Sequence, residues 1–299
     1  HPLNLIEFVF AEELSMSDIR VPNKRIPNVL TIAGTDPSGG AGIQADLKAF
    51  SAAGAYGMSV ITAVVAQNTQ GVRAFQALDP EFVFDQAAAV FEDVQVDAVK
   101  IGMVANAGII EAITKALDQY TDKATCPVVL DPVMVAKSGD SLLDADTEGA
   151  LREQLVPRST LITPNLPEAS VLLDLDAEMN SLDQMQENAD KLLALGCDWV
   201  LLKGGHLEGH TSELSTDILI GPDTRVELTA PRIATTNDHG TGCTLSAAIA
   251  ARLPRMDMES AVREAKDYLT AALKHADQLN VGHGHGPVHH FHNLWRNNA

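Results

Sequence analysis

The chain has few cysteines and no long hydrophobic run. Its 299 residues include three cysteines, Cys126, Cys197 and Cys243, which are widely spaced and form no CxxC pair. An odd number with this spacing argues against a disulfide framework or a thiolate metal site and fits a reducing compartment, so we expect a cytoplasmic protein. No apolar run approaches about 20 residues, so we expect no membrane-spanning helix.

Basic residues are also scarce. The 21 Lys and Arg residues stand against 40 Asp and Glu, which gives a formal net charge of −19. That charge would repel a nucleic-acid duplex or an anionic membrane surface. A phosphorylated ligand would have to be held locally, by backbone N–H groups, a few lysines and a metal ion. The expected partner is therefore a small molecule, with neither nucleic acid nor membrane.

No linker divides the chain into two domains. Strand-like and helix-like segments alternate without a break, so we expect one α/β domain at residues 28–299, long enough to bury a large core. Residues 1–27 are expected to be an N-terminal extension. His1–Ser15 lacks an initiator methionine and carries three glutamates, which argues against a signal peptide, and Met16 is a candidate natural start.

Short apolar runs predict strands that are buried on both faces, which calls for a mostly parallel central sheet flanked by helices on both faces. We expect strands at Val29–Ala33, Met58–Val65, Ala98–Ile101, Val128–Leu130, Leu161–Thr163 and Val200–Leu202. Apolar periodicity and small-residue runs predict helices at Ile43–Ala53, Glu81–Val94, Ser181–Leu195 and Thr244–Ala251. Ser215–Ile220 and Arg225–Leu228 are expected to form an antiparallel hairpin.

Ligands bind beyond the C-terminal strand ends of such sheets, and most unusual clusters in this chain follow a strand. The most informative cluster is the loop 237–243, with the sequence Asn-Asp-His-Gly-Thr-Gly-Cys. Its glycines allow successive N–H groups to face one concavity at a helix N-terminus, which suits a phosphate or a developing oxyanion. The alternative is an ordinary glycine-rich turn with Cys243 as a small buried hydrophobe.

Two further clusters follow the first strands. The loop Gly34–Gly42 matches no standard nucleotide fingerprint, but its glycines allow close approach to a small ligand. Asp36 or Asp46 is expected to meet a hydroxyl or an amine, and the alternative for Asp36 is a turn residue. Gln67 offers both a donor and an acceptor, which suits the edge of a nitrogen heterocycle. A water-exposed strand end is the simpler alternative for Gln67.

Later strands are followed by five more candidates. Met103 and Val133 could lie against a flat ring, with core packing as the alternative. Asn165 and Glu168 could hold a hydrated Mg²⁺, which favours oxygen ligands. They could equally form a helix cap with Glu168 in the first turn. Lys203 ends a strand in front of two glycines, where it is well placed for a phosphate.

The sequence offers two other arrangements of reactive side chains. Cys243 and His239 could form a thiol–imidazole pair, but they are separated by a tight loop and no orienting partner is evident. The tail from His283 to His292 could bind a divalent metal. Because a glycine-spaced segment makes a poor preorganised site, we expect a surface or packing role for this tail.

Taken together, the clusters resemble the hydroxymethylpyrimidine/phosphomethylpyrimidine kinases of thiamine biosynthesis, within the ribokinase-like superfamily. The matching segments are 31–46, 65–69, 99–103, 130–134, 161–169, 202–206 and 239–243. The resemblance implies a single ribokinase-like α/β domain, a homodimer, and two transfers that depend on ATP and Mg²⁺. The first phosphorylates the hydroxymethyl group of 4-amino-5-hydroxymethyl-2-methylpyrimidine, and the second extends that monophosphate to the diphosphate.

The same resemblance implies roles for individual residues. Gln67 pairs with the aminopyrimidine edge. The remaining substrate-binding residues are Gly34, Ala41, Asp46, Met103 and Val133. The residues serving ATP phosphates and Mg²⁺ are Asn165, Glu168, Lys203 and Thr241, with Asn165 and Glu168 acting on the metal through water. The anion hole for the moving phosphoryl group comprises Gly240, Gly242 and Cys243.

Sugar kinases of the superfamily carry Asp where Cys243 stands, as the base on the substrate hydroxyl, whereas the pyrimidine branch has Cys. A free thiol titrates near about 8.5 and a helix N-terminus can lower that value, so we expect some thiolate at neutral pH. A pyridoxal-type kinase is the nearest alternative, although Gln67 favours the aminopyrimidine. A non-catalytic vitamer sensor and a thiol hydrolase are the more distant alternatives.

Overall fold

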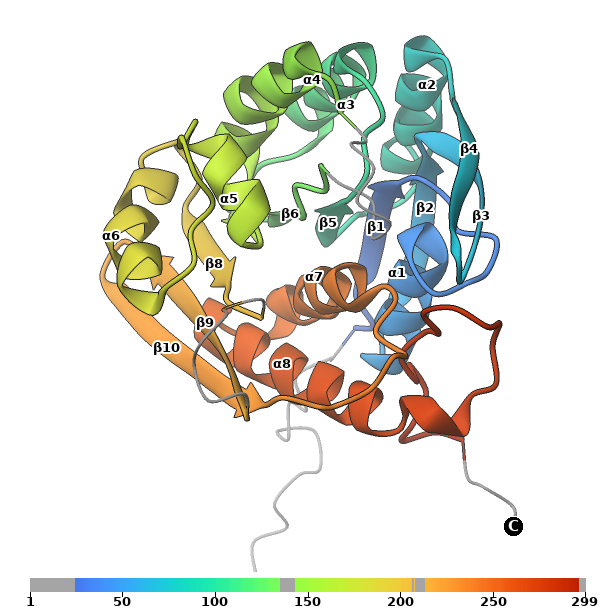
Figure 1. Ribbon diagram of the computed structural model, residues 1–299. Coiled ribbons are helices and arrows are strands. Elements are labelled where there is room, and N and C mark those ends of the chain that lie inside the picture. Colours follow the sequence, from blue (N-terminus) through green and yellow to red (C-terminus); the bar gives the residue numbers. More distant parts are fainter. Residues whose placement is uncertain (1–24, 135–142, 206, 208–212, 296–299) are drawn as a thin grey trace, which may run out of the picture.

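The computed structural model describes residues 25–134, 143–205, 207 and 213–295. An eight-stranded sheet has the order β10-β9-β8-β7-β6-β5-β1-β2 (Figure 1). Its strands are β1 (Asn28–Ala33), β2 (Tyr56–Ile61), β5 (Ala98–Ile101), β6 (Val128–Leu130), β7 (Leu161–Ile162), β8 (Trp199–Lys203), β9 (Leu214–Gly221) and β10 (Thr224–Pro231). Neighbours from β2 to β8 pair in parallel, whereas β9 and β10 are antiparallel. The predicted mostly parallel sheet is confirmed.

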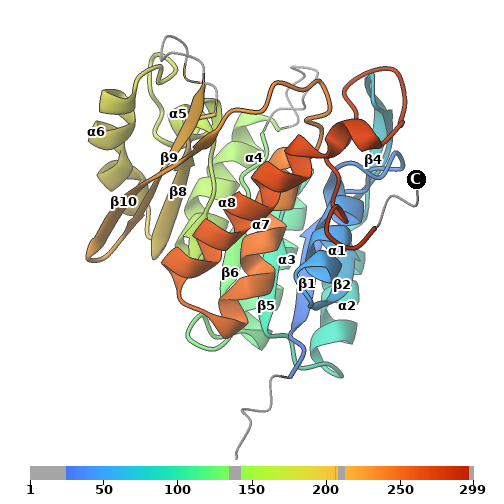
Figure 2. The ribbon, with the colours of Figure 1, turned by 90° about the horizontal axis from the view of Figure 1, so that it is seen from below.

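Helices cover both faces of this sheet. They are α1 (Gly42–Ala52), α2 (Pro80–Phe91), α3 (Ala107–Tyr120), α4 (Ala145–Ala150), α5 (Leu166–Leu172), α6 (Leu182–Leu193), α7 (Thr241–Arg252) and α8 (Met258–Lys274). Figure 2 shows α1, α7 and α8 together on one face. The other helices pack on the opposite face, so the sheet is buried from both sides.

Alternate residues of each strand enter two separate hydrophobic cores. Leu30 and Ile32 of β1 join the core beneath α2 to α6, while Val29 packs beneath α1, α7 and α8. In β8, Leu202 and Leu201 divide between the two cores in the same way. Each buried aliphatic side chain of this kind contributes about 1.5–3 kcal/mol. This two-sided burial explains why the strands read as continuous apolar runs.

The strand predicted at Met58–Val65 is wrong, because the chain changes sheets at Thr62. The register pairs Ile61 with Ala33, the last residue of β1, so β2 has no partner beyond that point. The N–H of Thr62 donates to the carbonyl of Ala33 at 3.0 Å, and the chain then leaves the main sheet. It continues as a hairpin that lies in its own sheet.

This hairpin consists of β3 (Ala63–Asn68) and β4 (Gly71–Ala77), which pair in antiparallel fashion. The sequence did not predict β4, because most of its side chains are exposed and show no clear apolar alternation. Gln67 therefore lies on a strand of the hairpin rather than after a strand of the main sheet.

The predicted helices are present with shifted ends. α2 ends at Phe91 rather than Val94, and α7 begins at Thr241 rather than Thr244. The earlier start places Cys243 in the first turn of α7. Among the described residues, no helix combines the length and apolar character needed to cross a bilayer.

Candidate active site

The N-terminus of α7 lies against the first glycine-rich loop. Gly240 is the N-cap of α7 and adopts a left-handed φ of 77°. A Cβ on Gly240 would lie 1.7 Å from the carbonyl oxygen of Gly40, so only glycine fits this contact. No side chain in the described ranges caps α7, and its first N–H groups are available to an anion.

Asp36 organises the glycine-rich loop from inside. Its Oδ1 accepts hydrogen bonds from the N–H and hydroxyl of Ser38, and its Oδ2 accepts from the N–H groups of Gly40 and Ala41 at 2.6–3.0 Å. The carboxylate is fully buried. The predicted ligand contact of Asp36 is wrong, because the loop itself occupies the carboxylate, and the turn-residue alternative holds.

His239 also binds Asp36 and is not the partner of Cys243. Its Nε2 lies 2.8 Å from Oδ2 of Asp36. Burial opposes ionisation of Asp36, but the hydrogen bonds from His239 and Ser38 outweigh it and lower the pKa of the carboxyl. Among the described residues no hydrogen bond joins His239 to Cys243, so the geometry gives no support to a thiol–imidazole pair.

Several of the predicted ring-binding residues meet at the same edge of the sheet. A Cβ on Gly34 would lie 3.1 Å from Sδ of Met103. Ala41 borders the α7 N-terminus, since a Cβ on Gly240 would lie 3.1 Å from its Cα. Val133 follows β6 and is half-buried, as is Gln67 on the hairpin. The structure therefore brings Gly34, Met103 and Ala41 to the mouth of the α7 loop.

Lys203 reaches the same helix terminus from the end of β8. Its Nζ lies 3.1 Å from Oδ1 of Asp131, which also accepts from the hydroxyl of Thr163. A Cβ on Gly242 would lie 3.5 Å from both Oδ2 of Asp131 and Nζ of Lys203. Burial opposes ionisation of Asp131, but Lys203 and Lys100 lower the pKa of its carboxyl. The pairing of Asp131 with Lys203 was not predicted from the sequence.

Asn165 and Glu168 form the helix cap that was one of their two predicted roles. The side-chain oxygen of Asn165 accepts from the N–H of Glu168, and Oε2 of Glu168 accepts from the N–H of Asn165, both at 2.8 Å. Burial raises the pKa of Glu168 to about 7, although Lys203 opposes the shift. A buried carboxyl with a raised pKa would be stabilised in its ionised form by a nearby cation.

The described residues contain no group of three or more His, Cys, Asp or Glu side chains that could hold a metal ion. A Mg²⁺ near Glu168 would therefore complete its coordination with waters and phosphate oxygens, as this ion commonly does. The site fits a metal that is shared with a phosphate ligand. It does not fit a metal enclosed by protein ligands alone.

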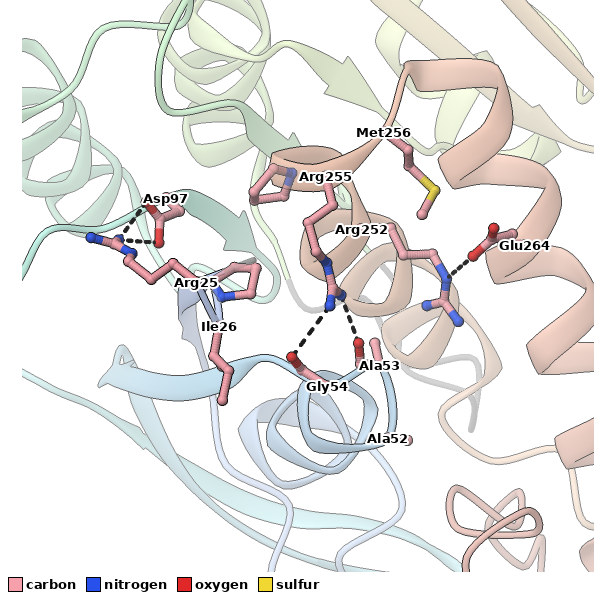
Figure 3. Close-up of a pocket in the computed structure, with 12 residues that line it drawn as sticks. Arg25, Ile26, Ala52, Ala53, Gly54, Asp97, Arg252, Arg255, Met256 and Glu264 are labelled. Carbon is pink, nitrogen blue, oxygen red and sulfur yellow. Dashed lines mark hydrogen bonds and ion pairs between the residues drawn. The ribbon is translucent and has the colours of Figure 1, made fainter. Parts of the chain in front are cut away.

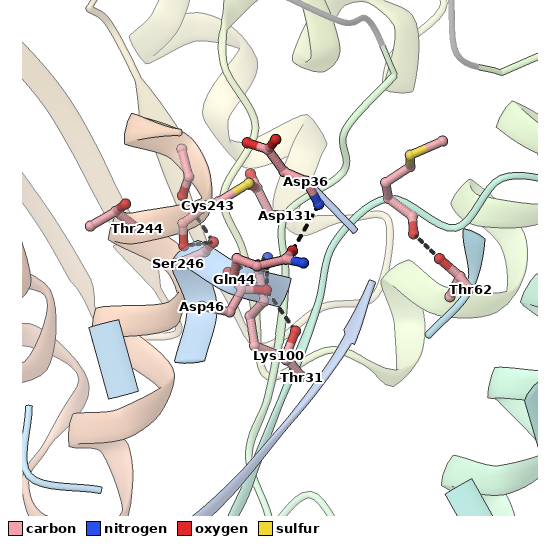
Figure 4. Close-up of polar contacts among 12 residues, drawn as sticks. Thr31, Asp36, Gln44, Asp46, Thr62, Lys100, Asp131, Cys243, Thr244 and Ser246 are labelled. Atoms are coloured by element: carbon pink, nitrogen blue, oxygen red, sulfur yellow. Dashed lines mark hydrogen bonds and ion pairs between the residues drawn. The ribbon is translucent and has the colours of Figure 1, made fainter. Parts of the chain in front are cut away.

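Asp46 and Lys100 form an ion pair below Cys243 (Figure 4). Nζ of Lys100 lies 2.9 Å from both carboxylate oxygens of Asp46, and the hydroxyl of Thr31 donates to Oδ2 at 2.6 Å. Both charged side chains have 0 % exposure. The predicted substrate contact of Asp46 does not fit this structure, because its carboxylate is closed off by internal partners. No role for the charge of Lys100 was predicted from the sequence.

The thiol of Cys243 is protonated at neutral pH in the ligand-free protein. Burial raises its pKa to about 11, with Lys100 lowering it and Asp46 and Asp131 raising it. The expected fraction of thiolate is therefore wrong for this state, because the cost of burial exceeds the benefit of the helix terminus. The thiol can act as a base only if the bound ligands change this balance.

The histidine-rich tail packs against the site, as expected. Nε2 of His290 lies 3.0 Å from the hydroxyl of Thr244, and the N–H of His285 donates to the carbonyl of Thr69 at 2.8 Å. His289 and His290 are buried. The tail thus joins the end of β3 to the first turns of α7.

A cavity of about 670 Å³ lies at the opposite end of α7 (Figure 3). Three arginines line it, each with a partner. Arg25 binds Asp97, Arg252 binds Glu264, and Arg255 donates to the carbonyls of Ala53 and Gly54, which follow α1. Arg255 also donates to Ala251 in the last turn of α7 at 3.1 Å. These contacts tie helix ends together on the far side from the candidate active site.

Comparison with known proteins agrees with this geometry. The family model described as phosphomethylpyrimidine kinase matches residues 36–289. A hydroxymethylpyrimidine/phosphomethylpyrimidine kinase of Escherichia coli (strain K12) is 55% identical over 273 residues, covering 91% of this chain and 100% of that protein.

Two solved structures share the fold. The crystal structure of a phosphomethylpyrimidine kinase from Clostridium difficile 630 is 43% identical with a TM-score of 0.72, covering 83% of this chain and 99% of the other. An ADP complex of Bacillus subtilis pyridoxal kinase is 38% identical with a TM-score of 0.81, covering 91% and 100%. With the matched family model and the 55% identical relative, this chain belongs to the phosphomethylpyrimidine kinase family.

Proposed function

We propose that this chain transfers the γ-phosphoryl group of ATP to 4-amino-5-hydroxymethyl-2-methylpyrimidine and then converts the monophosphate to the diphosphate. The observation that carries the proposal is the uncapped N-terminus of α7, which faces Lys203 and the glycine-rich loop. The names of the matched relatives support the same pair of substrates.

Phosphoryl transfer depends mainly on positioning and charge neutralisation, and the site supplies both. The N–H groups of Thr241, Gly242 and Cys243 receive the oxygens of the moving phosphoryl group at the helix N-terminus. Lys203, fixed by Asp131, neutralises the phosphates from the other side. The glycine-rich loop, held by its hydrogen bonds to Asp36, packs against Gly240.

The chemistry that Mg²⁺ would supply when bound is neutralisation of the charge on the ATP phosphates. Glu168 is the residue of this chain that would hold the ion through water, with Asn165 keeping the Glu168 side chain in place through the helix cap. Cys243 is the proposed base on the substrate hydroxyl. Gln67 would pair with the aminopyrimidine edge, and Gly34, Ala41, Met103 and Val133 would line the ring.

A pyridoxal kinase is the second candidate, because a pyridoxal kinase structure matches this chain with a TM-score of 0.81. Both substrates are flat nitrogen-containing rings with a hydroxymethyl group. The amide of Gln67 suits an aminopyrimidine edge, which offers a donor beside an acceptor.

Product analysis separates these candidates. The protein is incubated with MgATP and either the pyrimidine alcohol or pyridoxal, and the products are identified by mass spectrometry. We expect both the monophosphate and the diphosphate of the pyrimidine, with slower or no conversion of pyridoxal. Phosphorylation of pyridoxal alone would overturn the substrate assignment, and ATP-independent turnover would overturn the kinase assignment.

We also propose a homodimer. Large apolar side chains are exposed on β2, the hairpin and α2, namely Tyr56, Val64, Phe75 and Phe82. Exposed apolar surface of this kind favours association. Sedimentation equilibrium is expected to give about twice the chain mass of 31.9 kDa. A monomer at assay concentrations would contradict the proposal.

A further inference from the structure

Lys100 occupies a position where the fold calls for an apolar residue. It lies on the central strand β5, two residues after Ala98, and the two side chains share the sheet face that α7 covers. Its side chain has 0 % exposure. Burying an ammonium group costs several kcal/mol even with a partner, and an ion pair is weak evidence for stability. Packing alone therefore gives no reason for this lysine.

The ammonium group is held in one place. Asp46 binds it through both carboxylate oxygens at 2.9 Å, and Thr31 fixes Asp46 in turn. Gly102 leaves room for it, because a Cβ there would lie 2.8 Å from Nζ of Lys100. The position of the charge is thus set by three different elements, β1, α1 and β5.

This fixed charge acts on Cys243. Charged groups reach the thiol from β5, α1 and the segment after β6, namely Lys100, Asp46 and Asp131. Of these, Lys100 is the cation, and it acts more strongly on the thiol than Asp46 does. The nearby Lys203 is bonded to Asp131. Figure 4 shows Asp131 beside Cys243 in the first turn of α7, with Asp46 and Lys100 below them.

We propose that Lys100, fixed by Asp46, is a positioning residue that stabilises the thiolate of Cys243 when this residue takes up the substrate hydroxyl proton. The inference deepens the proposed function and rests on it for its catalytic meaning. The electrostatic effect itself exists without ATP or substrate, so it can be measured in the free protein.

The test is the rate of Cys243 alkylation by iodoacetamide from about pH 7 to about pH 9.5, followed by peptide mass spectrometry. Below the thiol pKa this rate follows the thiolate fraction, so the displacement of the rate–pH line between two variants gives the shift of the titration midpoint. A nearby opposite charge typically shifts a pKa by about one to three units, so Lys100→Met is expected to raise the Cys243 midpoint by about that amount. The matched control is Lys123→Met, which removes a partly exposed lysine that is likewise 2.9 Å from an aspartate, Asp198. It is expected to leave the midpoint unchanged.

The buried thiols Cys126 and Cys197 report on folding in the same experiment, because they become alkylated if a variant unfolds. If Lys100→Met unfolds, the double variant Lys100→Met with Asp46→Asn, which removes both charges, is used in its place. This pair is also expected to raise the midpoint, since Lys100 acts on the thiol more strongly than Asp46. An unchanged or lowered midpoint in a folded variant overturns the proposal.

The kcat/KM profile of the variant gives a second readout. We expect its ascending limb, which reports deprotonation of the base, to move to higher pH by the same amount as the thiol midpoint. A uniform loss of kcat/KM at every pH, with the thiol midpoint unchanged, would show a purely structural role. The proposed kinase function would survive that result, because it is tested separately by product formation.

Discussion

The side chains of the candidate site form two groups. Those of the first group face the ligand space, and those of the second hold the first group in place. Cys243 and Lys203 belong to the first group, whereas Asp36, Asp131 and Lys100 act from within the protein. Buried charged groups of the second kind are costly unless they are fully bonded. Substitutions in the first group should therefore affect turnover, whereas those in the second should affect folding and, at Lys100, also the pH dependence of kcat/KM.

Cys243→Ala is expected to lower kcat severely, by about 10²–10⁴-fold for the loss of a general base, while ATP binding survives. The backbone N–H groups that receive the phosphates are unchanged by the substitution, which is why binding should persist. Steady-state kinetics and calorimetric titration with an ATP analogue measure the two effects. Cys197→Ala is the control, since its thiol lies in the core and bonds to Leu192. An unchanged kcat in Cys243→Ala would refute the role as base.

Asp36→Asn is expected to reduce the free energy of unfolding by about 1.5–3 kcal/mol, as for the loss of hydrogen bonds to a charged group. The folded pKa of Asp36 is lowered, so its contribution is present above the unfolded pKa, near about 3.9, and is lost as the pH falls below that value. The difference between wild type and variant should therefore shrink in acid. Urea unfolding at several pH values measures it, and a difference that grows in acid would contradict this account.

At the scale of helices and strands, the sequence predicted those elements that a local pattern of apolar and turn residues marks. The buried strands were predicted correctly because two-sided burial leaves a clear apolar signature, and the hairpin of β9 and β10 because the turn residues at 221–223 separate its strands. The main error, at Thr62, arose because an apolar run does not show where a strand loses its neighbour. The pair of Lys100 and Asp46 was missed for a related reason, since 54 residues separate its members and no local spacing marks them.

The start of α7 depends on a backbone contact, which makes glycine necessary there. Gly240→Ala would place a methyl carbon 1.7 Å from a backbone oxygen at a φ of 77°. We expect a loss of about 1–3 kcal/mol from strain alone, and a large fall in kcat/KM because the two loops must separate. Thermal unfolding and kinetic assays would measure both.

Gly149→Ala is the matched control for this glycine. It lies in α4, and a Cβ there meets nothing within 4 Å. Alanine is favoured over glycine inside a helix, so this variant should be more stable by about 0.5–1 kcal/mol with unchanged activity. Equal behaviour of the two variants would contradict the contact described at Gly240.

Over the whole molecule, α7 separates two regions with different tasks. Its N-terminus borders the candidate active site, and its C-terminus is tied to α1 by Arg255 on the other side of the fold. The C-terminal tail returns along this axis and joins α7 to the hairpin. Changes in the tail should therefore weaken the fold and also disturb the site.

His290 makes this connection sensitive to acid. Burial lowers its pKa from 6.5 to about 3, so the folded protein keeps the ring neutral while the unfolded chain takes up a proton. The contribution is present above the unfolded pKa of 6.5 and decreases as the pH falls. At about pH 5 the loss in the free energy of unfolding should reach roughly 2 kcal/mol.

His290→Gln should reduce this acid sensitivity, whereas His283→Gln, at an exposed position, should retain it. Denaturant unfolding from about pH 7.5 to about pH 5 measures the slopes, and equal slopes would contradict the assignment.

The break at Thr62 has a consequence for how this fold can change. Because β3 pairs with β4 rather than with the main sheet, Gln67, the proposed partner of the aminopyrimidine edge, lies on a module whose ladder is independent of the large sheet. If Gln67 binds the ring as proposed, mutations on this hairpin can alter which substrate is accepted while the proposed phosphate site on α7 and β8 stays intact. Selectivity and chemistry can thus diverge separately in descendants of one ancestral gene.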